Sequence, residues 1–168
     1  MAERTLPVDD LTDDAFAPFG TVVHTPARAH DATGPGWQWW AETVVLKDDG
    51  RPWAVGYLDL EPSPPPRFDW AERHLRSQEA IVPVSGGCLV YVAPPDHPDE
   101  PDRLPPFDAF QVFRIPPGSG VVMDPAVWHG APIAEEPAKA IVLLLAGTGR
   151  DDVTVVRFED APIEIERG

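Results

Sequence analysis

Prolines and glycines divide this chain into short segments. The 168 residues include 22 prolines and 13 glycines, and the stretches between them are rich in Val, Ile, Leu, Trp and Phe. This rhythm is typical of an all-β sandwich or barrel, because proline and glycine interrupt helices and favour turns. We therefore expect an all-β fold in which long helices are nearly excluded.

One short helix is expected near the N-terminus, over Thr12 to Phe19. Thr12 can cap it, and Asp13 and Asp14 suit the positive end of the helix dipole. Gly20 is a natural stop.

The remaining apolar segments predict strands, and the proline-rich stretches 62–66 and 94–106 are expected to be connections. Because strands of similar character lie on both sides of these stretches, we expect residues 1–168 to form a single domain. The predicted strands lie near Thr21–Val23, Trp37–Leu46, Trp53–Leu60, Phe68–His74, Glu79–Val84, Cys88–Ala93, Ala109–Ile115, Gly120–Met123, Ala138–Leu145 and Val153–Phe158.

The charge of the chain argues against whole classes of partner. With 28 acidic and 13 basic residues the net charge is −15, which repels nucleic acid and anionic membrane surfaces. A small anionic substrate stays possible, because a metal ion can reverse the sign locally. We expect the single cysteine, Cys88, to be a small core residue, and a lone cysteine indicates a reduced cytoplasmic setting. No secretory signal or membrane-spanning segment is evident in the sequence.

Four side chains in the middle and second half of the chain are candidate metal ligands. Glu72 and His74 lie two residues apart in a predicted strand, so they share a face, whereas Arg73 points the other way and is interpreted as a surface or interface residue. Glu79 opens the next strand, and His129 follows a predicted turn. Carboxylates and imidazoles that converge in a barrel can hold a divalent metal with open coordination positions.

The spacing of these residues resembles the two motifs of the cupin superfamily. The first motif reads Gly, five residues, His-x-His, three or four residues, Glu, six residues, Gly. Glu72 stands at its first His, His74 at the second, Glu79 at the Glu and Gly86 at the last Gly. The second motif, Pro-x-Gly-x-x-His, is one residue shorter here, over 125–129. The resemblance implies a cupin-like (RmlC-like) β-barrel or jelly roll with a short N-terminal helix.

Within the cupins, the chain is similar over nearly its whole length to the ureidoglycolate lyase family, formerly called ureidoglycolate hydrolases. Residues 11–20 resemble that family's opening helix and strand. Residues 72–74 followed by 80–83 resemble its "ERH…AFIP" signature, and residues 127–129 resemble its "VWH". The resemblance implies a carbon–nitrogen lyase that cleaves (S)-ureidoglycolate to glyoxylate and urea, a late step of purine nitrogen recovery through allantoin.

The same resemblance suggests roles for individual residues. Glu72, His74 and His129 are the expected metal ligands, Glu79 is a fourth ligand or the base, and Asp124 is a further proton-transfer candidate. Glu79 stands where one branch of the family has Gln, and Asp124 where it has His, so an altered metal or substrate is possible. The metal itself is left open among manganese, iron, nickel and zinc.

Several other residues have two interpretations. Arg114 could pair with the substrate carboxylate or form an exposed ion pair, and Trp128 could be a substrate wall or plain core. Trp37 and Trp39 share a face, which indicates core packing or a dimer contact. We expect a homodimer, because barrel edges and exposed tryptophans favour one.

Two alternatives to the lyase remain. One is a different metal-dependent cupin enzyme, such as an isomerase or oxygenase of a small carboxylic acid, because the fold does not fix the chemistry. The other is a non-catalytic cupin that binds a small molecule. His74 and His129 favour an enzyme, whereas a cavity packed by aromatic side chains would favour the binding protein.

Overall fold

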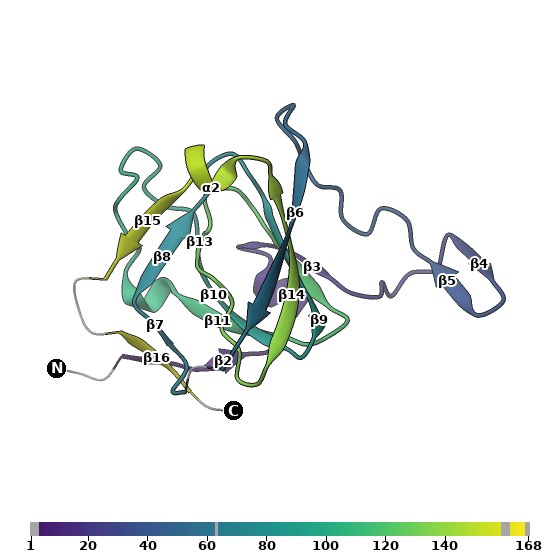
Figure 1. The fold of residues 1–168 in the computed structure, drawn as a ribbon, viewed down its shortest axis with the longest axis horizontal. Coiled ribbons are helices and arrows are strands. Elements are labelled where there is room, and N and C mark those ends of the chain that lie inside the picture. The colour runs from purple at the N-terminus through teal and green to yellow at the C-terminus, as the bar shows by residue number, and fades with distance from the viewer. Residues whose placement is uncertain (1–3, 63, 159–161, 167–168) are drawn as a thin grey trace.

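Two β-sheets pack face to face and form the body of the molecule (Figure 1). The computed structural model describes residues 4–62, 64–158 and 162–166. In spatial order, the five-stranded sheet contains β3 (Gly20–Val23), β12 (Gly120–Met123), β9 (Glu79–Ser85), β14 (Ala138–Leu145) and β6 (Trp53–Leu60). The six-stranded sheet contains β15 (Thr154–Arg157), β8 (Trp70–Arg73), β13 (Trp128–His129), β10 (Cys88–Ala93), β11 (Gln111–Ile115) and β2 (Val8–Asp9).

The main core lies between the two sheets and is closed at one end by helix α1 (Asp13–Phe16). The Oγ1 of Thr12 caps the helix by accepting the N–H of Ala15 at 3.1 Å. The helix is shorter than expected and continues as a turn, in which the N–H of Phe19 donates to the carbonyl of Phe16. Phe16, Phe19 and Phe113 form a ring cluster with centroid distances of 5.3 to 5.9 Å.

A second apolar cluster covers the outer face of the six-stranded sheet. A small sheet of β1 (Thr5–Leu6), β16 (Ile163–Ile165) and β7 (Arg67–Phe68) packs there, together with the 3-10 helix η1 (Phe107–Ala109). Phe68 of this layer stacks on Tyr91 of β10 with the ring centroids 3.8 Å apart. The six-stranded sheet is therefore buried on both faces, which explains why every residue of β10 is buried.

None of the described residues forms such a layer over the outer face of the five-stranded sheet. Val55 and Tyr57 of β6 are 70% and 59% exposed. Ile141 of β14 lies directly between Tyr57 and Val82 in the strand register, so the apolar side chains form a continuous row. Such a row on an open sheet face marks a contact surface more often than a solvated one.

A hairpin of β4 (Ala32–Gly34) and β5 (Trp37–Trp39) projects away from the body (Figure 1). Trp37 and Trp39 are 53% and 58% exposed, so of the two expected alternatives core packing is wrong and a dimer contact stays a prediction. The strand expected over 37–46 ends at Trp39, because side chains take up the backbone groups that follow. The N–H of Ala41 donates to Asp31, and its carbonyl accepts from Arg28.

The expected all-β fold, with two packed sheets and a short N-terminal helix, is confirmed. Strands β6, β10, β12 and β14 have the expected bounds, whereas the strand expected over 68–74 is divided into β7 and β8. Strand β13 was expected as a turn, and helix α2 (Thr148–Asp151) was not expected. Among the described residues, no helix has the length and apolar character needed to cross a membrane.

The phenylalanine cluster predicts a large stability loss on truncation. Phe113→Ala should lower the free energy of unfolding by about 3–5 kcal/mol, because it leaves a cavity among Phe16 and Phe19. Val45→Ala, on a 67% exposed side chain, should change it by less than about 0.5 kcal/mol. Chemical denaturation of the two variants measures both values, and equal losses would contradict the assignment of the core.

Candidate functional site

Glu72 and His129 face each other across two neighbouring strands. In the antiparallel pairing of β8 with β13, His129 lies directly opposite Glu72. His74 follows the end of β8, and one ligand atom from each of these three residues lies within 4.8 Å of the others. Glu79 reaches the same place from the first position of β9, in the other sheet. The structure thus brings together all four side chains that were expected to bind metal.

A tight turn delivers β13 to this position. Ala126 has a φ of 68°, in the left-handed region that favours glycine. Its N–H donates to the carbonyl of His74 at 2.6 Å. The turn therefore connects the strand that carries His129 to the backbone of His74.

Backbone carbonyls orient both imidazoles. The Nδ1–H of His74 donates to the carbonyl of Asp152, and that of His129 donates to the carbonyl of Val127, each at 2.9 Å. Since a carbonyl can only accept, both Nε2 atoms are left to face the cluster, and each lies 3.2 Å from Oε2 of Glu79. Histidines that bind metals show this arrangement, with one ring nitrogen anchored and the other free.

Charge coupling perturbs the titration of the cluster. Burial raises the pKa of Glu79, but His129 and His74 outweigh it and lower the pKa to about 2. Burial lowers the pKa of His129, and the charge and hydrogen bond of Glu79 reverse this and raise it overall. The pKa of Glu72 is raised, mainly by burial. Two carboxylates and two imidazoles in a buried space form a donor set that fits a divalent cation.

A cavity of about 460 Å³ opens beside Glu72, His74 and Glu79. Its other described lining residues are mainly aliphatic, and Tyr57 is the aromatic residue among them. No lysine or arginine is found among the described lining residues. An anionic ligand in this cavity would therefore need a bound cation, or a group from outside it, to balance its charge. The walls are Gly56, Tyr57, Leu58, Ala131, Pro132, Val142, Leu144, Gly149, Val153 and Val155.

Arg73 is completely buried behind the cluster, so its interpretation as a surface or interface residue is wrong. Its guanidinium lies over the ring of Trp128, 4.5 Å from the ring centroid. It donates to the carbonyls of Asp96 at 2.7 Å and Glu100 at 3.2 Å, which explains how the 94–106 loop covers a charged side chain. Trp128 is core, and its Nε1–H donates to Asp96 at 3.0 Å.

The structure does not bring Asp124 or Arg114 to the cluster. Asp124 is exposed and accepts from the side-chain amide of Gln78 at 3.1 Å. Arg114 is exposed on β11 and forms an ion pair with Glu135. Neither lines the cavity. The carbonyl groups of Asp152 and Val127, which orient the imidazoles, were missed because a backbone acceptor has no side-chain signature.

A family model described as ureidoglycolate lyase matches residues 3–166. The chain belongs to the ureidoglycolate lyase family. It is similar to a ureidoglycolate lyase from Pseudomonas syringae pv. tomato, with 30% identity over 75% of this chain and 74% of that protein. A ureidoglycolate lyase from Brucella anthropi is 25% identical over 99% of this chain and 97% of its own length.

Solved structures are more distant. A TDP-fucose-3,4-ketoisomerase from Campylobacter jejuni matches with 9% identity and a TM-score of 0.49, over 80% of this chain and 87% of its own. A match this distant bears on neither the substrate nor the reaction of the ureidoglycolate lyase family.

The ion pair between Glu79 and His129 predicts how the stability of the metal-free protein depends on pH. The lowered pKa of Glu79 stabilises the fold above the ordinary value of 4.5, and this is lost as the pH falls toward 2. The raised pKa of His129 stabilises it below the ordinary value of 6.5, and this is lost as the pH rises through the raised value.

Thermal unfolding of the metal-free chain across this range, compared with Glu79→Gln, isolates the contribution of the pair. The difference in melting temperature between the two proteins should be largest between pH 4.5 and pH 6.5, the ordinary pKa values of a glutamate and a histidine. It should shrink at lower and at higher pH. A difference that stays constant with pH would contradict the pairing.

Proposed function

We propose that this protein is a metal-assisted ureidoglycolate lyase, which cleaves (S)-ureidoglycolate to glyoxylate and urea in allantoin degradation. Membership of the ureidoglycolate lyase family supports the reaction. The observation that carries the proposal is the convergence of Glu72, His74, His129 and Glu79 at the edge of one cavity. The mainly aliphatic walls favour this enzyme over an aromatic-lined binding protein.

Glu72, His74 and His129 are the proposed metal ligands. A divalent cation held there would polarise the substrate hydroxyl and balance the substrate carboxylate. The mixed oxygen and nitrogen donors suit manganese, iron, nickel or zinc. The carbonyl groups behind both imidazoles keep the Nε2 lone pairs directed at the cluster, so the site is organised before substrate arrives.

Glu79 is the proposed base. Its carboxylate accepts the hydroxyl proton of the substrate, the carbonyl group of glyoxylate forms, and the carbon–nitrogen bond breaks. The proton then passes to the departing nitrogen of urea, so the cleavage needs no water and no redox partner. The low pKa of Glu79 keeps the carboxylate ionised at neutral pH. Aliphatic residues, among them Leu58 and Val142, line the cavity beside this carboxylate.

Glu79→Gln separates the two roles that remain possible for this residue. If Glu79 is the base, turnover should fall by about 10²–10⁴-fold while the metal content is retained. If it is a fourth ligand, the metal content itself should fall. Metal analysis and a glyoxylate-release assay measure the two outcomes, and unchanged values in both would exclude both roles.

Arg114→Ala is the matched control for that experiment. Its side chain is charged but lies outside the cavity, in an ion pair with Glu135. We expect the Michaelis constant for ureidoglycolate to change by less than about twofold, as is usual for an exposed ion pair. A large rise would instead support a role for Arg114 in binding the substrate carboxylate.

We also propose that the enzyme is a cytoplasmic homodimer. The uncovered row of Tyr57, Ile141 and Val82 and the exposed tryptophans of the β4–β5 hairpin support self-association, because a free apolar sheet face is costly to hydrate. Cys88 is unpaired and buried, which suits a reducing compartment.

Ile141→Asp should disrupt this dimer by placing a charge in the middle of the row. Light scattering should give twice the chain mass of 18.4 kDa for the wild type and a single chain mass for the variant. Arg157→Asp, on the exposed strand β15, should stay dimeric. A wild type that is monomeric at micromolar concentration would contradict the proposal.

A further inference from the structure

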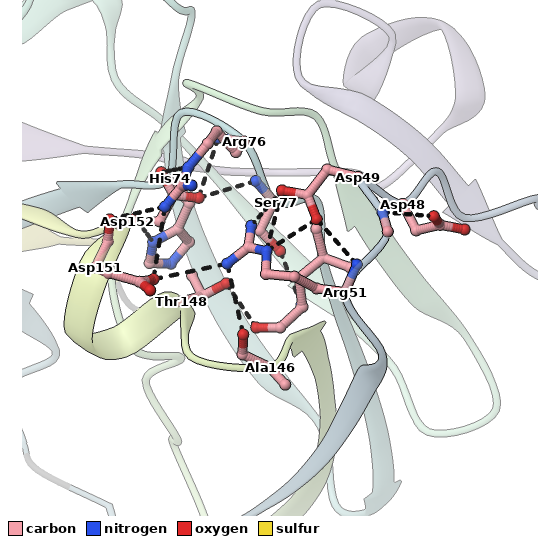
Figure 2. A network of polar contacts seen from close by, with 12 residues as sticks. Asp48, Asp49, Arg51, His74, Arg76, Ser77, Ala146, Thr148, Asp151 and Asp152 are labelled. Atoms are coloured by element: carbon pink, nitrogen blue, oxygen red, sulfur yellow. Dashed lines mark hydrogen bonds and ion pairs between the residues drawn. The ribbon is translucent and has the colours of Figure 1, made fainter.

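Asp152 lies where helix α2 ends and contacts the backbone beside His74 (Figure 2). It is 8% exposed, and it is separated from His74 by 78 positions in the sequence. The side chain and the main chain of Asp152 each make a separate contact with this segment. Both contacts bear on how His74 is held.

The carboxylate of Asp152 accepts three consecutive backbone N–H groups. Oδ1 accepts from Leu75 at 3.0 Å, and Oδ2 accepts from Arg76 and Ser77 at 3.1 Å each. The side chain of Arg76 adds an ion pair at 3.5 Å. Charge-assisted bonds of this kind are stronger than neutral ones, so the segment that follows His74 is fixed to α2.

The main-chain carbonyl of Asp152 accepts the Nδ1–H of His74 at 2.9 Å. The hydrogen bonds of the carboxylate fix the position of Asp152, and with it the position of this carbonyl. A single residue therefore fixes both the backbone after His74 and the rotation of its ring.

The element that carries Asp152 is itself tied to the five-stranded sheet. The Oγ1–H of Thr148 donates to the carbonyl of Leu145 at 2.7 Å, and the N–H of Leu145 donates to Oγ of Ser77 at 3.0 Å. The N–H of Asp152 donates to the carbonyl of Thr148 at 3.0 Å. Figure 2 shows Ser77, Thr148 and Asp152 within one network of polar contacts. In the same network, Arg51 forms ion pairs with Asp49 and Asp151.

We propose that Asp152 is a positioning residue for the metal site. It holds His74 in the tautomer with Nδ1 protonated and directs Nε2 at Glu72, His129 and Glu79. The inference rests on the proposed function only in that the cluster binds a metal. Removal of the carboxylate releases residues 75–77, and with them the alignment of the carbonyl with Nδ1.

Asp152→Asn tests this role, because an amide can present only one oxygen to the three N–H groups. The dissociation constant of the protein for Mn²⁺ or Ni²⁺ alone should rise about 10–100-fold, the range measured when the outer partners of ligating histidines are removed. Nitrogen-15 NMR of the imidazoles should show the Nδ1–H tautomer of His74 weakened, while His129, anchored by Val127, keeps its own.

Asp151→Asn is the control, since it removes the same charge from the same helix end. Asp151 forms exposed ion pairs with the side chains of Arg51 and Arg76. The backbone N–H groups of residues 75–77 donate to Asp152 and not to Asp151. Its metal affinity should stay within about twofold of the wild type, as expected for exposed ion pairs. An Asp152→Asn protein that binds metal as the wild type does, with an unchanged His74 tautomer, overturns the proposal.

The two readouts also separate this inference from the proposed function. If the wild type binds neither ion, the metal-assisted lyase fails, and the tautomer of His74 still decides the role of Asp152. If Asp152→Asn does not fold, Asp152→Glu keeps the charge and the acceptors but lengthens the side chain. If Asp152→Glu keeps the wild-type His74 tautomer and metal affinity, the role of the carboxylate is supported. If the control Asp151→Asn loses both, the proposal is overturned.

Discussion

The antiparallel register between β8 and β13 is the constraint on which the site depends. It sets Glu72 opposite His129 on the cavity side and leaves Arg73 and Trp128 on the other side. A shift by one residue would exchange the faces, because neighbouring side chains of a strand point in opposite directions. The contact between Arg73 and Trp128, and the bonds of both to Asp96, oppose such a shift from behind.

Burial on both faces of the six-stranded sheet makes this register rigid. The inner face belongs to the main core, and the outer face is covered by the small sheet and the 94–106 loop. The cluster therefore lies on a fixed strand pair, while the last two contributors, His74 and Glu79, sit at strand ends. There, the carbonyl of Asp152 and the pairing of β9 with β12 supply the missing constraints. A preorganised donor set of this kind lowers the cost of binding a cation.

Much of the fold was predictable because the apolar runs are short and cleanly bounded. Cys88–Ala93 follows two glycines and precedes two prolines, and the strand has those bounds. The burial of Trp37 and Trp39 could not be predicted, because the alternation of side chains along a strand indicates only which of them share a face. It does not indicate whether a second layer covers that face. Trp128 and His129 read as part of a turn, since a two-residue strand carries too little pattern to be recognised.

The candidate site also has a part that the sequence predicted and a part that it did not. The alternation of Glu72 with His74 and the spacing to Glu79 were enough to predict which side chains would meet. Arg73 was misjudged because a charged residue is rarely buried without partners, and its partners are carbonyl groups in a distant loop. Asp152 could not be anticipated, since its contacts join segments that are 75 to 78 positions apart in the sequence.

The central claim is that Glu72, His74 and His129 hold a divalent metal with Glu79 beside it. Anomalous diffraction from crystals grown with Mn²⁺ tests it most directly, because the signal locates the ion without reference to activity. We predict one strong peak in direct contact with both Nε2 atoms and with a Glu72 oxygen, since mixed imidazole and carboxylate donors suit this ion. A cluster without a peak, or an ion bound only elsewhere on the chain, would contradict the claim.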